Sequence, residues 1–391
     1  MGSSLRARLN AMKSSDVQKS VPLARSGLRS IKRESVMDRA FVASPGKNAL
    51  NRLGVAFPWP QAEEILFLDT ETTGLQGGAG TLAFLIGLGY FQDDTFITEQ
   101  YIIGDYSDEA ELYARVIARI KEFSALVTFN GRAFDVPMMK TRLVMLRMND
   151  AISMLDQFNH IDLLLPSRRL WKKRLHSVKL SILEEKILRQ GRTDDLPGSE
   201  APKRFFQYLK CADATLLDPV IEHNAQDIRS MPQVLFELMG AYSLSGKLRE
   251  ADDQFSMGRT LEKQGERTEA IRLYHMASLP RAVTTISALR SKRVASEALY
   301  ALGMLYKRLG DHAHAVESFQ TLVSRDQMGV KPMIELAKYY EHKARDFETA
   351  LGWTQCAIAT EEDPLLQSAF HKRKARLEKK INRTGCDEDG I

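Results

Sequence analysis

Residues 65–72, ILFLDTET, decide the fold and the chemistry expected of this chain of 391 residues. Four apolar residues are followed by acids alternating with threonines, which predicts a buried strand that ends at a functional edge. Because side chains alternate across a strand, Asp69 and Glu71 point to the same face, roughly 6–7 Å apart. Two such carboxylates repel each other unless a cation lies between them, and a hard divalent ion resolves the repulsion. Most bare acid pairs at strand ends are simply solvated, so this pair needs support from elsewhere.

A second acid comes from residues 129–137, FNGRAFDVP. A short strand ends at Phe129, the pair Asn130-Gly131 turns the chain, and Asp135 stands at the start of a helix with Pro137 in its first turn. An ordinary N-cap aspartate would have the same surroundings.

A third piece lies in residues 216–239, LLDPVIEHNAQDIRSMPQVLFELM. Residues four apart share one helical face, so His223 and Asp227 project together. Asp227 is suited to bind a metal ion, and His223 is suited to act on a water molecule bound nearby. A solvated helix pair would show the same spacing.

The segments around these motifs predict an α/β domain with a mixed sheet. Strands are expected at residues 82–90, 96–103 and 125–129, and helices at 108–123 and 136–148. The glycine-rich stretch 74–80 lacks the Lys-Ser/Thr ending of a P-loop, so we interpret it as a β-hairpin turn.

Helical repeats follow after about residue 241. The stretch 298–319, ALYALGMLYKRLGDHAHAVESF, has glycine, tyrosine, alanine and phenylalanine at tetratricopeptide positions, and 333–351 repeats the layout. Tyr306 and Tyr340 are 34 residues apart, which is the tetratricopeptide period. Because one helix pair cannot bury its apolar face alone, the repeats are expected to stack.

Together, DTET, NGRAFD and a histidine ahead of the last aspartate resemble the DEDD exonuclease superfamily in order and placement. The stretches 74–91 and 195–209 and the repeats narrow the resemblance to YprB-type ribonuclease H-like proteins, over about residues 58–360. The resemblance implies an α/β ribonuclease H-like mixed-sheet domain followed by an all-α tetratricopeptide-like helical repeat domain.

For function, the resemblance implies a metal-dependent 3′–5′ exonuclease acting on single-stranded RNA or DNA. Two divalent ions, Mg²⁺ or Mn²⁺, would be held by Asp69, Glu71, Asp135 and Asp227, with Asp69 bridging both, and His223 would act on the attacking water. The chain departs from the superfamily in one respect. Histidine usually precedes the last aspartate by five positions, and His223 precedes Asp227 by four, the spacing usual for tyrosine.

Several residues are candidates for nucleic-acid contacts: Thr72, Gly74 and Leu75 beside the first motif, Asn130 and Phe134 beside the second, and Arg169, Lys172 and Lys173 from a basic stretch over 168–192. Phosphates attract such charge, and the interleaved Trp171 could stack on a base. The alternatives are a solvated helix face for the basic stretch and core packing for Phe134.

Four regions are expected: a basic, mostly flexible arm over 1–57 with a short helix at 5–12, the nuclease-like domain over 58–240, the repeats over 241–380, and a flexible tail over 381–391. Formal net charge is +5, which is weak support for a nucleic-acid partner. No apolar run reaches the roughly 20 residues of a membrane span. Three scattered cysteines suit a reducing cytoplasm.

Two other functions stay open at this point. The chain could be a catalytically inactive nucleic-acid-binding protein that uses the ribonuclease H-like fold as a platform. It could also be a tetratricopeptide adaptor with a vestigial nuclease domain, in which the repeats hold a protein partner. Retention of all four acids favours the enzyme, because clustered carboxylates without a use are costly.

Overall fold

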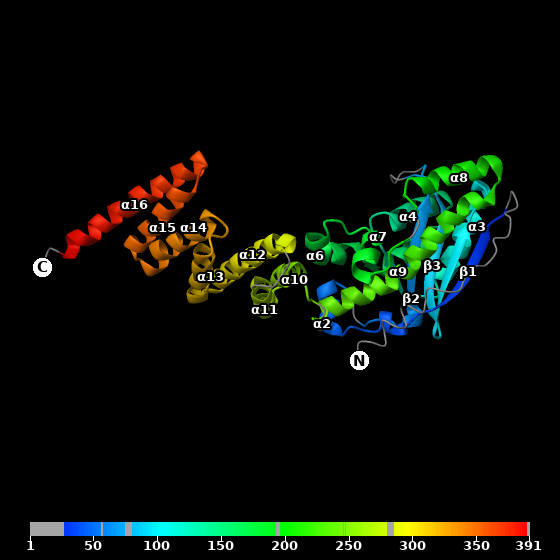
Figure 1. The fold of residues 1–391 in the computed structure, drawn as a ribbon. Helices are drawn as coiled ribbons and strands as arrows, with labels where there is room; N and C mark the ends of the chain where they lie inside the picture. Colours follow the sequence, from blue (N-terminus) through cyan, green and yellow to red (C-terminus); the bar gives the residue numbers. More distant parts are fainter. Residues whose placement is uncertain are drawn as a thin grey trace. The chain divides into compact units, whose positions relative to one another are not determined.

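The structure is a computed structural model that describes residues 27–388 except 56–57, 75–79, 193–195, 245, 247 and 280–284. The side chains of residues 285–288 and 384–388 are also outside the description. The chain forms two compact units, unit 1 (Met1–Lys247) and unit 2 (Leu248–Ile391), and each is described by itself. Figure 1 draws their helices and strands.

Unit 1 is built on a mixed sheet, which confirms the predicted α/β class. Its described strands are β1 (Arg29–Val36), β2 (Ile65–Thr72), β3 (Ala83–Gln92), β4 (Thr95–Ile102), β5 (Ala125–Thr128) and β6 (Asn159–Asp162). They lie in the order β1-β4-β3-β2-β5-β6. The first four pair antiparallel, while β5 runs parallel to both β2 and β6. Strand β2 therefore lies between β3 and β5, and its acidic end pairs with β3 and extends past the residues that pair with β5.

Helices surround this sheet. The longer ones are α2 (Lys47–Leu53), α3 (Glu109–Ile120), α4 (Asp135–Met145), α5 (Asn149–Gln157), α6 (Leu164–Leu175), α8 (Glu200–Cys211) and α9 (Asp218–Tyr242). Short turns of helix are η1 (Arg39–Val42), η2 (Ala62–Glu64), η3 (Tyr106–Asp108), α7 (Leu180–Leu183), η4 (Glu184–Leu188) and η5 (Ala214–Leu217). Within the described ranges, no helix is both long and apolar enough to cross a membrane.

Helix α9 packs across β2, β3 and β4 (Figure 1), and two glycines of β3 make the close approach possible. A Cβ atom at Gly87 would lie 2.1 Å from Oδ1 of Asn224, and one at Gly89 would lie 2.4 Å from Cγ2 of Ile228. Residues two apart on a strand share a face, so the glycines clear a path for the helix. This path brings the polar side chains of α9 to the end of β2.

The expected flexible arm over residues 1–57 is wrong for residues 29–53. Strand β1 pairs with β4 along its whole length, and η1 and α2 follow it. Arg52 of α2 donates a hydrogen bond of 3.0 Å to the carbonyl of Tyr242, and Phe41 packs edge-on against Phe236 with ring centroids 5.2 Å apart. An edge strand with one exposed face needs few apolar residues, so its sequence looks polar. Residues 1–26, with the helix expected at 5–12, lie outside the described part.

Among its described residues, unit 2 contains helices and no strands. Its elements are α10 (Ala251–Lys263), α11 (Arg267–Ser278), α12 (Thr285–Leu309), α13 (His312–Ser324), α14 (Val330–Tyr339), η6 (Tyr340–Ala344), α15 (Phe347–Thr360) and α16 (Pro364–Glu388). Successive helices pack as hairpins. A Cβ atom at Gly303 would lie 2.8 Å from the ring of Phe319, so the glycine allows α12 and α13 to approach closely.

The expected flexible tail over 381–391 is wrong as far as residue 388, because α16 continues to Glu388. The helix begins at Pro364 and contains no later proline, and its residues are mostly good helix formers. Phe370 and Leu377 are buried on its inner side.

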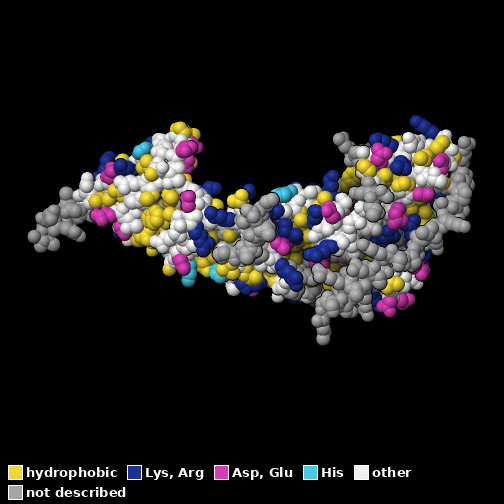
Figure 2. All heavy atoms as spheres, viewed as in Figure 1, with side chains coloured by type: hydrophobic (Ala, Val, Ile, Leu, Met, Phe, Trp, Pro, Cys, Tyr) yellow, Lys and Arg dark blue, Asp and Glu magenta, His cyan; other side chains and the backbone are white. Residues whose placement is uncertain are grey.

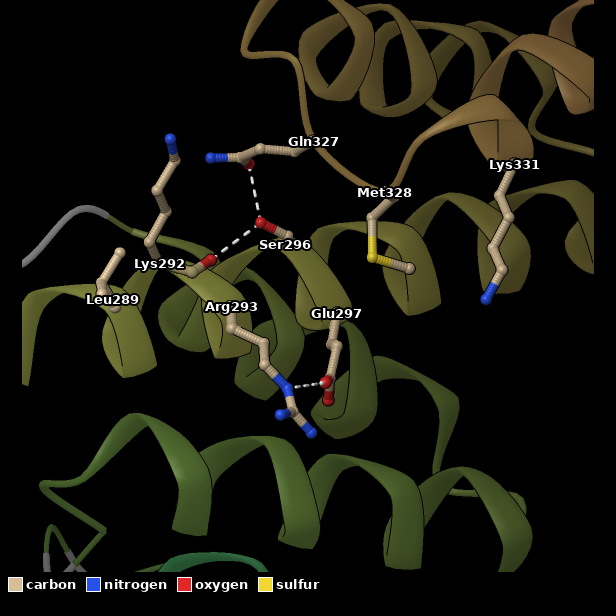
Figure 3. A pocket seen from close by; sticks show the side chains of 8 residues that line it. All are labelled: Leu289, Lys292, Arg293, Ser296, Glu297, Gln327, Met328 and Lys331. Atoms are coloured by element: carbon tan, nitrogen blue, oxygen red, sulfur yellow. Dashed lines mark hydrogen bonds and ion pairs between the residues drawn. The ribbon is translucent and has the colours of Figure 1, made fainter. Parts of the chain in front are cut away.

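A hollow of about 530 Å³ opens in unit 2 between α12 and the start of α14. Figure 3 shows its lining side chains, with Ser296 donating to Gln327 at 2.8 Å and Arg293 bonded to Glu297 at 3.0 Å. Basic residues outnumber acidic ones in this lining, which consists of Leu289, Lys292, Arg293, Ser296, Glu297, Gln327, Met328 and Lys331.

Candidate metal and catalytic site

Asp69 is fixed by a row of polar groups that runs from the sheet to α9. Gly87 of β3 lies opposite Asp69, and Gln100 of β4 lies opposite Gly87. Asn224 of α9 donates from Nδ2 to Oδ2 of Asp69 at 2.9 Å, and its Oδ1 accepts from Nε2 of Gln100 at 2.8 Å. Asn224 and Gln100 are fully buried. These two amides orient the carboxylate, and the sequence prediction missed both of them.

Asp135 is the first residue of α4 and is nearly fully buried. Thr70 Oγ1 donates to its Oδ1 at 2.5 Å. Burial raises the pKa of Asp135 to about 6, although the hydrogen bond from Thr70 opposes the shift and the charge of Asp162 adds to it. Asp162, at the end of β6, accepts hydrogen bonds from the backbone N–H of Asn130 at 2.9 Å and of Arg132 at 3.1 Å. Asp162 therefore fixes the turn before Asp135, and the sequence prediction missed it too.

His223 and Asp227 lie one turn apart on α9, as the spacing predicts. Nε2 of His223 and Oδ2 of Asp227 are 3.7 Å apart, which is too long for a direct hydrogen bond. Both side chains are largely buried, with exposed fractions of 18% and 16%. They form a polar stripe on α9 that faces the acids of β2.

Arg192, which belongs to the basic stretch over 168–192, contacts both residues of this stripe. Its guanidinium contacts Asp227 through Nη2, bonds to Glu184 at 2.5 and 2.9 Å, and bonds to Nδ1 of His223 at 3.0 Å. Burial raises the pKa of Asp227, while the charges of His223 and Arg192 oppose the shift. The fully buried Glu184 also accepts a hydrogen bond from Ser230 of α9.

The contact between Arg192 and His223 fixes the proton of the neutral imidazole. A guanidinium has only donors, so Nδ1 of His223 must accept, and the neutral ring then carries its hydrogen on Nε2. In this arrangement His223 can donate a hydrogen bond from Nε2 but cannot accept a proton there. The predicted role as a proton acceptor for water therefore requires Arg192 to move away from the ring.

Asp69 and Glu71 of β2, Asp135 of α4 and Asp227 of α9 lie near enough for their charges to interact, and we call these residues the carboxylate cluster. Burial raises the pKa of Asp69 well above its usual range, and the charges of the other three raise it further. Burial likewise raises the pKa of Glu71 to about 8, with added repulsion from Asp227 and Asp135. Such raised pKa values are typical of carboxylates that lie near other carboxylates and have little contact with water.

An all-oxygen set of carboxylates suits a hard divalent ion such as Mg²⁺ or Mn²⁺, because the ion would relieve this repulsion. Among the described residues, no group of three or more His, Cys, Asp or Glu side chains is already spaced as metal ligands are. Three of the four acids are instead bonded to donors of the protein: Asp69 to Asn224, Asp135 to Thr70 and Asp227 to Arg192.

The nucleic-acid candidates fall into different environments. Arg169 and Lys172 are exposed on α6, and Lys173 beside them is partly buried. Figure 2 shows basic and acidic side chains interspersed on the face that it draws. Trp171 is only 4% exposed, so it belongs to the core, and its predicted stacking role is wrong.

Around the two loops, Asn130 is exposed with φ 73°, a left-handed conformation that asparagine tolerates, and Phe134 is half-buried. Thr72 is buried and donates to the carbonyl of Gly74 at 2.7 Å. Leu75, and most of the expected 74–80 turn, lie outside the described residues.

The comparisons with known proteins agree with this fold. The RNase H superfamily matches residues 66–239, and a tetratricopeptide repeat matches residues 296–327. Unit 1 is thus a ribonuclease H-like domain, and unit 2 carries a tetratricopeptide repeat. The "Uncharacterized protein YprB" of Bacillus subtilis (strain 168) is 32% identical over 327 residues, which are 81% of this chain and 75% of that protein. The chain belongs to the YprB family.

A solved structure, the family B DNA polymerase from the hyperthermophilic archaeon Pyrobaculum calidifontis, aligns with 64% of this chain at 14% identity and a TM-score of 0.33. The alignment spans 30% of the polymerase chain. A likeness this low carries no argument about the protein.

Proposed function

We propose that this protein is a metal-dependent 3′–5′ exonuclease that hydrolyses the phosphodiester bonds of single-stranded nucleic acid. The observation that carries the proposal is the carboxylate cluster, in which partly or fully buried acids come from β2, α4 and α9. Burial and the charges of the neighbouring acids raise the pKa values of Asp69 and Glu71 in this cluster. Membership of the RNase H superfamily supports a nuclease in general. The direction of cutting and the exonucleolytic mode rest on the resemblance to DEDD exonucleases.

The carboxylate cluster would hold two divalent ions, Mg²⁺ or Mn²⁺. When bound, such ions supply an activated water molecule and stabilise the leaving 3′ oxygen. The protein's part is to keep the carboxylates oriented and poorly solvated. Asn224 does this for Asp69, and Thr70 does it for Asp135.

His223 is proposed to orient the attacking water. With Nδ1 bonded to Arg192, the neutral imidazole offers an N–H donor at Nε2. If Arg192 leaves the ring, the proton can move to Nδ1, and Nε2 becomes an acceptor that can take a proton from water. Either role keeps His223 beside the reacting atoms without binding a metal.

Nucleic acid is proposed to reach the cluster past α6 and the two loops. The cationic residues Arg169, Lys172 and Lys173 would attract phosphates. Gly74, Leu75, Thr72 and Asn130 lie next to the motifs that carry the acids and would contact the terminal nucleotide, with Phe134 against its base. RNA and DNA are equally compatible with these contacts.

Incubation with end-labelled single-stranded RNA and DNA in the presence of Mn²⁺ tests the proposal. Stepwise shortening from the 3′ end that stops on addition of EDTA is the expected result. Retention of the labelled strand without shortening would favour a catalytically inactive nucleic-acid-binding protein. Neither binding nor shortening would favour a tetratricopeptide adaptor whose front domain is vestigial.

The repeats of unit 2 are proposed to hold a protein partner. The hollow beside α12 is lined by Lys292, Arg293 and Lys331 against one acid, Glu297, so an acidic segment suits it best. A cytoplasmic location stays a prediction from the cysteine content.

A further inference from the structure

Arg192 occupies an unusual place, because a buried cation of the protein contacts a carboxylate that we assign to metal binding. Its side chain is 9% exposed, and that of Asp227 is 16% exposed. The guanidinium reaches α9 from the chain just after η4. An arginine in this place could either hold Asp227 ready for metal or keep it from metal, and the geometry distinguishes the two.

The bonds of Arg192 are divided unequally between its partners. Nε and Nη2 both bond to Glu184, at 2.5 and 2.9 Å, and the same Nη2 contacts Asp227. Glu184 is itself fully buried and is anchored by Ser230 of α9. Arg192 therefore forms a bidentate ion pair with Glu184, whereas Asp227 contacts one nitrogen, Nη2, which Glu184 also uses.

Because of this division, the contact between Arg192 and Asp227 can break with a small loss of stability. A buried charge that loses its only partner is strongly destabilising, but Arg192 keeps both bonds to Glu184 if Asp227 turns away. Asp227, in turn, is repelled by the other acids of the cluster and is held by its contact with Arg192. A divalent ion among those acids would attract Asp227 more strongly than a shared guanidinium nitrogen does.

We propose that Arg192 is an internal counter-ion that competes with divalent metal for Asp227, so that metal binding requires Asp227 to leave Arg192 while Arg192 stays bonded to Glu184. This inference rests on the proposed function. Loss of the contact between Arg192 and Asp227 thus completes the metal site. Arg192 is a positioning residue, since it acts through Asp227.

The test is the affinity for Mn²⁺ of the full-length protein, measured by isothermal titration calorimetry without nucleic acid. The informative variant is the double substitution Glu184→Gln with Arg192→Gln, which removes one positive and one negative charge and leaves the net charge unchanged. The matched control is Glu200→Gln with Lys203→Gln, an exposed ion pair of 2.9 Å on α8. If Arg192 competes with metal, the first pair binds Mn²⁺ about tenfold more tightly than the wild type, and the control stays within about twofold.

Unchanged or weaker Mn²⁺ binding by the first pair would overturn the inference, because Arg192 would then hold Asp227 in place for the metal. A similar gain in the control pair would also overturn it. If the glutamine pair does not fold by circular dichroism, the apolar pair Glu184→Met with Arg192→Leu takes its place under the same criteria.

Failure of this inference is distinguishable from failure of the proposed function. In one outcome, the wild-type protein binds Mn²⁺ and shortens labelled strands, but the double variant gains no affinity for Mn²⁺. This outcome contradicts the inference about Arg192 and leaves the proposed function intact. Wild-type protein that neither binds Mn²⁺ nor cleaves removes the proposed function, and the inference falls with it.

Discussion

Two buried acidic centres, one in each unit, differ in how the protein treats their charge. In unit 2, Glu341 of η6 is fully buried and is bonded by Arg373, Arg376 and Lys380 of α16 at distances of 2.8–2.9 Å. Burial alone would raise the pKa of Glu341, but the hydrogen bonds from Arg376 and Lys380 lower it to about 2. In unit 1, burial and neighbouring acids raise the pKa values of Asp69 and Glu71 in the carboxylate cluster, and Arg192, which also bonds to Glu184, contacts Asp227.

The difference separates a structural ion cluster from the cluster that we propose to bind metal. The three cations of α16 neutralise Glu341 and fasten η6 to that helix, so the cluster needs nothing from outside. The acids of unit 1 repel one another, and the fold tolerates this cost because other contacts stabilise it. Acids that repel one another in this way are suited to bind a cation from solution, because the cation relieves the repulsion.

Substitution of Asp135 by asparagine gives the largest expected effect. The amide oxygen can still accept the hydrogen bond from Thr70, so the fold is kept, but a charged ligand is lost. Cleavage should fall by at least about 10³-fold, since electrostatic stabilisation of this kind is worth several kcal/mol. Initial rates of cleavage of labelled single strands in the presence of Mn²⁺ measure this loss.

The control variant is Asp94→Asn, at an acid whose side chain is 96% exposed, and it should cleave as the wild type does. If Asp135→Asn also cleaved at the wild-type rate, the assignment of Asp135 to the site would be wrong.

Divalent metal should stabilise unit 1 and leave unit 2 unaffected. At a Mn²⁺ concentration of 100 times the dissociation constant, the expected gain is about 2.7 kcal/mol of unfolding free energy. Hydrogen exchange followed by mass spectrometry resolves the two units, with slower exchange expected in peptides of β2 and α9 after Mn²⁺ is added. Protection that appears equally in α16 would contradict the distinction between the two centres.

Loss of Glu341 should destabilise unit 2, in contrast to loss of an acid of the cluster. In Glu341→Gln, the cations of α16 repel one another, and we expect a cost of about 2 kcal/mol, reduced because Arg376 is half exposed. Asp69→Asn removes repulsion and should not lower the stability of metal-free protein. Thermal unfolding compares these variants with Glu348→Gln, an exposed control on α15. If Asp69→Asn destabilised the protein as much as Glu341→Gln does, the proposed difference between the two acidic centres would be contradicted.

The pH dependence of the two centres should have opposite signs. Glu71 has its pKa raised to about 8 and Asp135 to about 6, so the stability that their protonated forms provide is present at low pH and is lost as pH rises toward 8. The pKa of Glu341 is lowered to about 2, so its contribution is present above about pH 4.5 and is lost as pH falls toward 2.

Metal-free unit 1 should therefore gain at least about 1 kcal/mol of stability between pH 8 and pH 6, and saturating Mn²⁺ should cancel this gain. Hydrogen exchange at the two pH values, corrected for the intrinsic rate, provides the measurement. A loss of protection in unit 1 as pH falls from 8 to 6 would be the opposite of what we expect.

Much of the fold and the four acids could be predicted from the sequence, because each depends on local patterns. The alternation in ILFLDTET fixes the faces of Asp69 and Glu71, and the helical spacing fixes His223 against Asp227. The 34-residue period identifies the repeats.

The missed residues depend on contacts between distant segments. Gln100, Asn224, Asp162 and Arg192 each bond to a partner at least 30 residues away along the chain, and no local pattern reports such pairs. Two signals were nevertheless present. The glycines at 87 and 89 interrupt an otherwise apolar strand, which indicates a close approach by another segment. On β4, Gln100 shares one face with Phe96 and Ile102, which likewise indicates a buried polar partner.

Crystals grown with Mn²⁺ and measured for anomalous scattering provide the most direct measurement. We predict two anomalous peaks among Asp69, Glu71, Asp135 and Asp227, with oxygen ligands at about 2.1 Å, and Arg192 bonded to Glu184 but not to Asp227. Well-ordered crystals at saturating Mn²⁺ with no peak among these four carboxylates would contradict the proposed metal site, and with it the proposed nuclease.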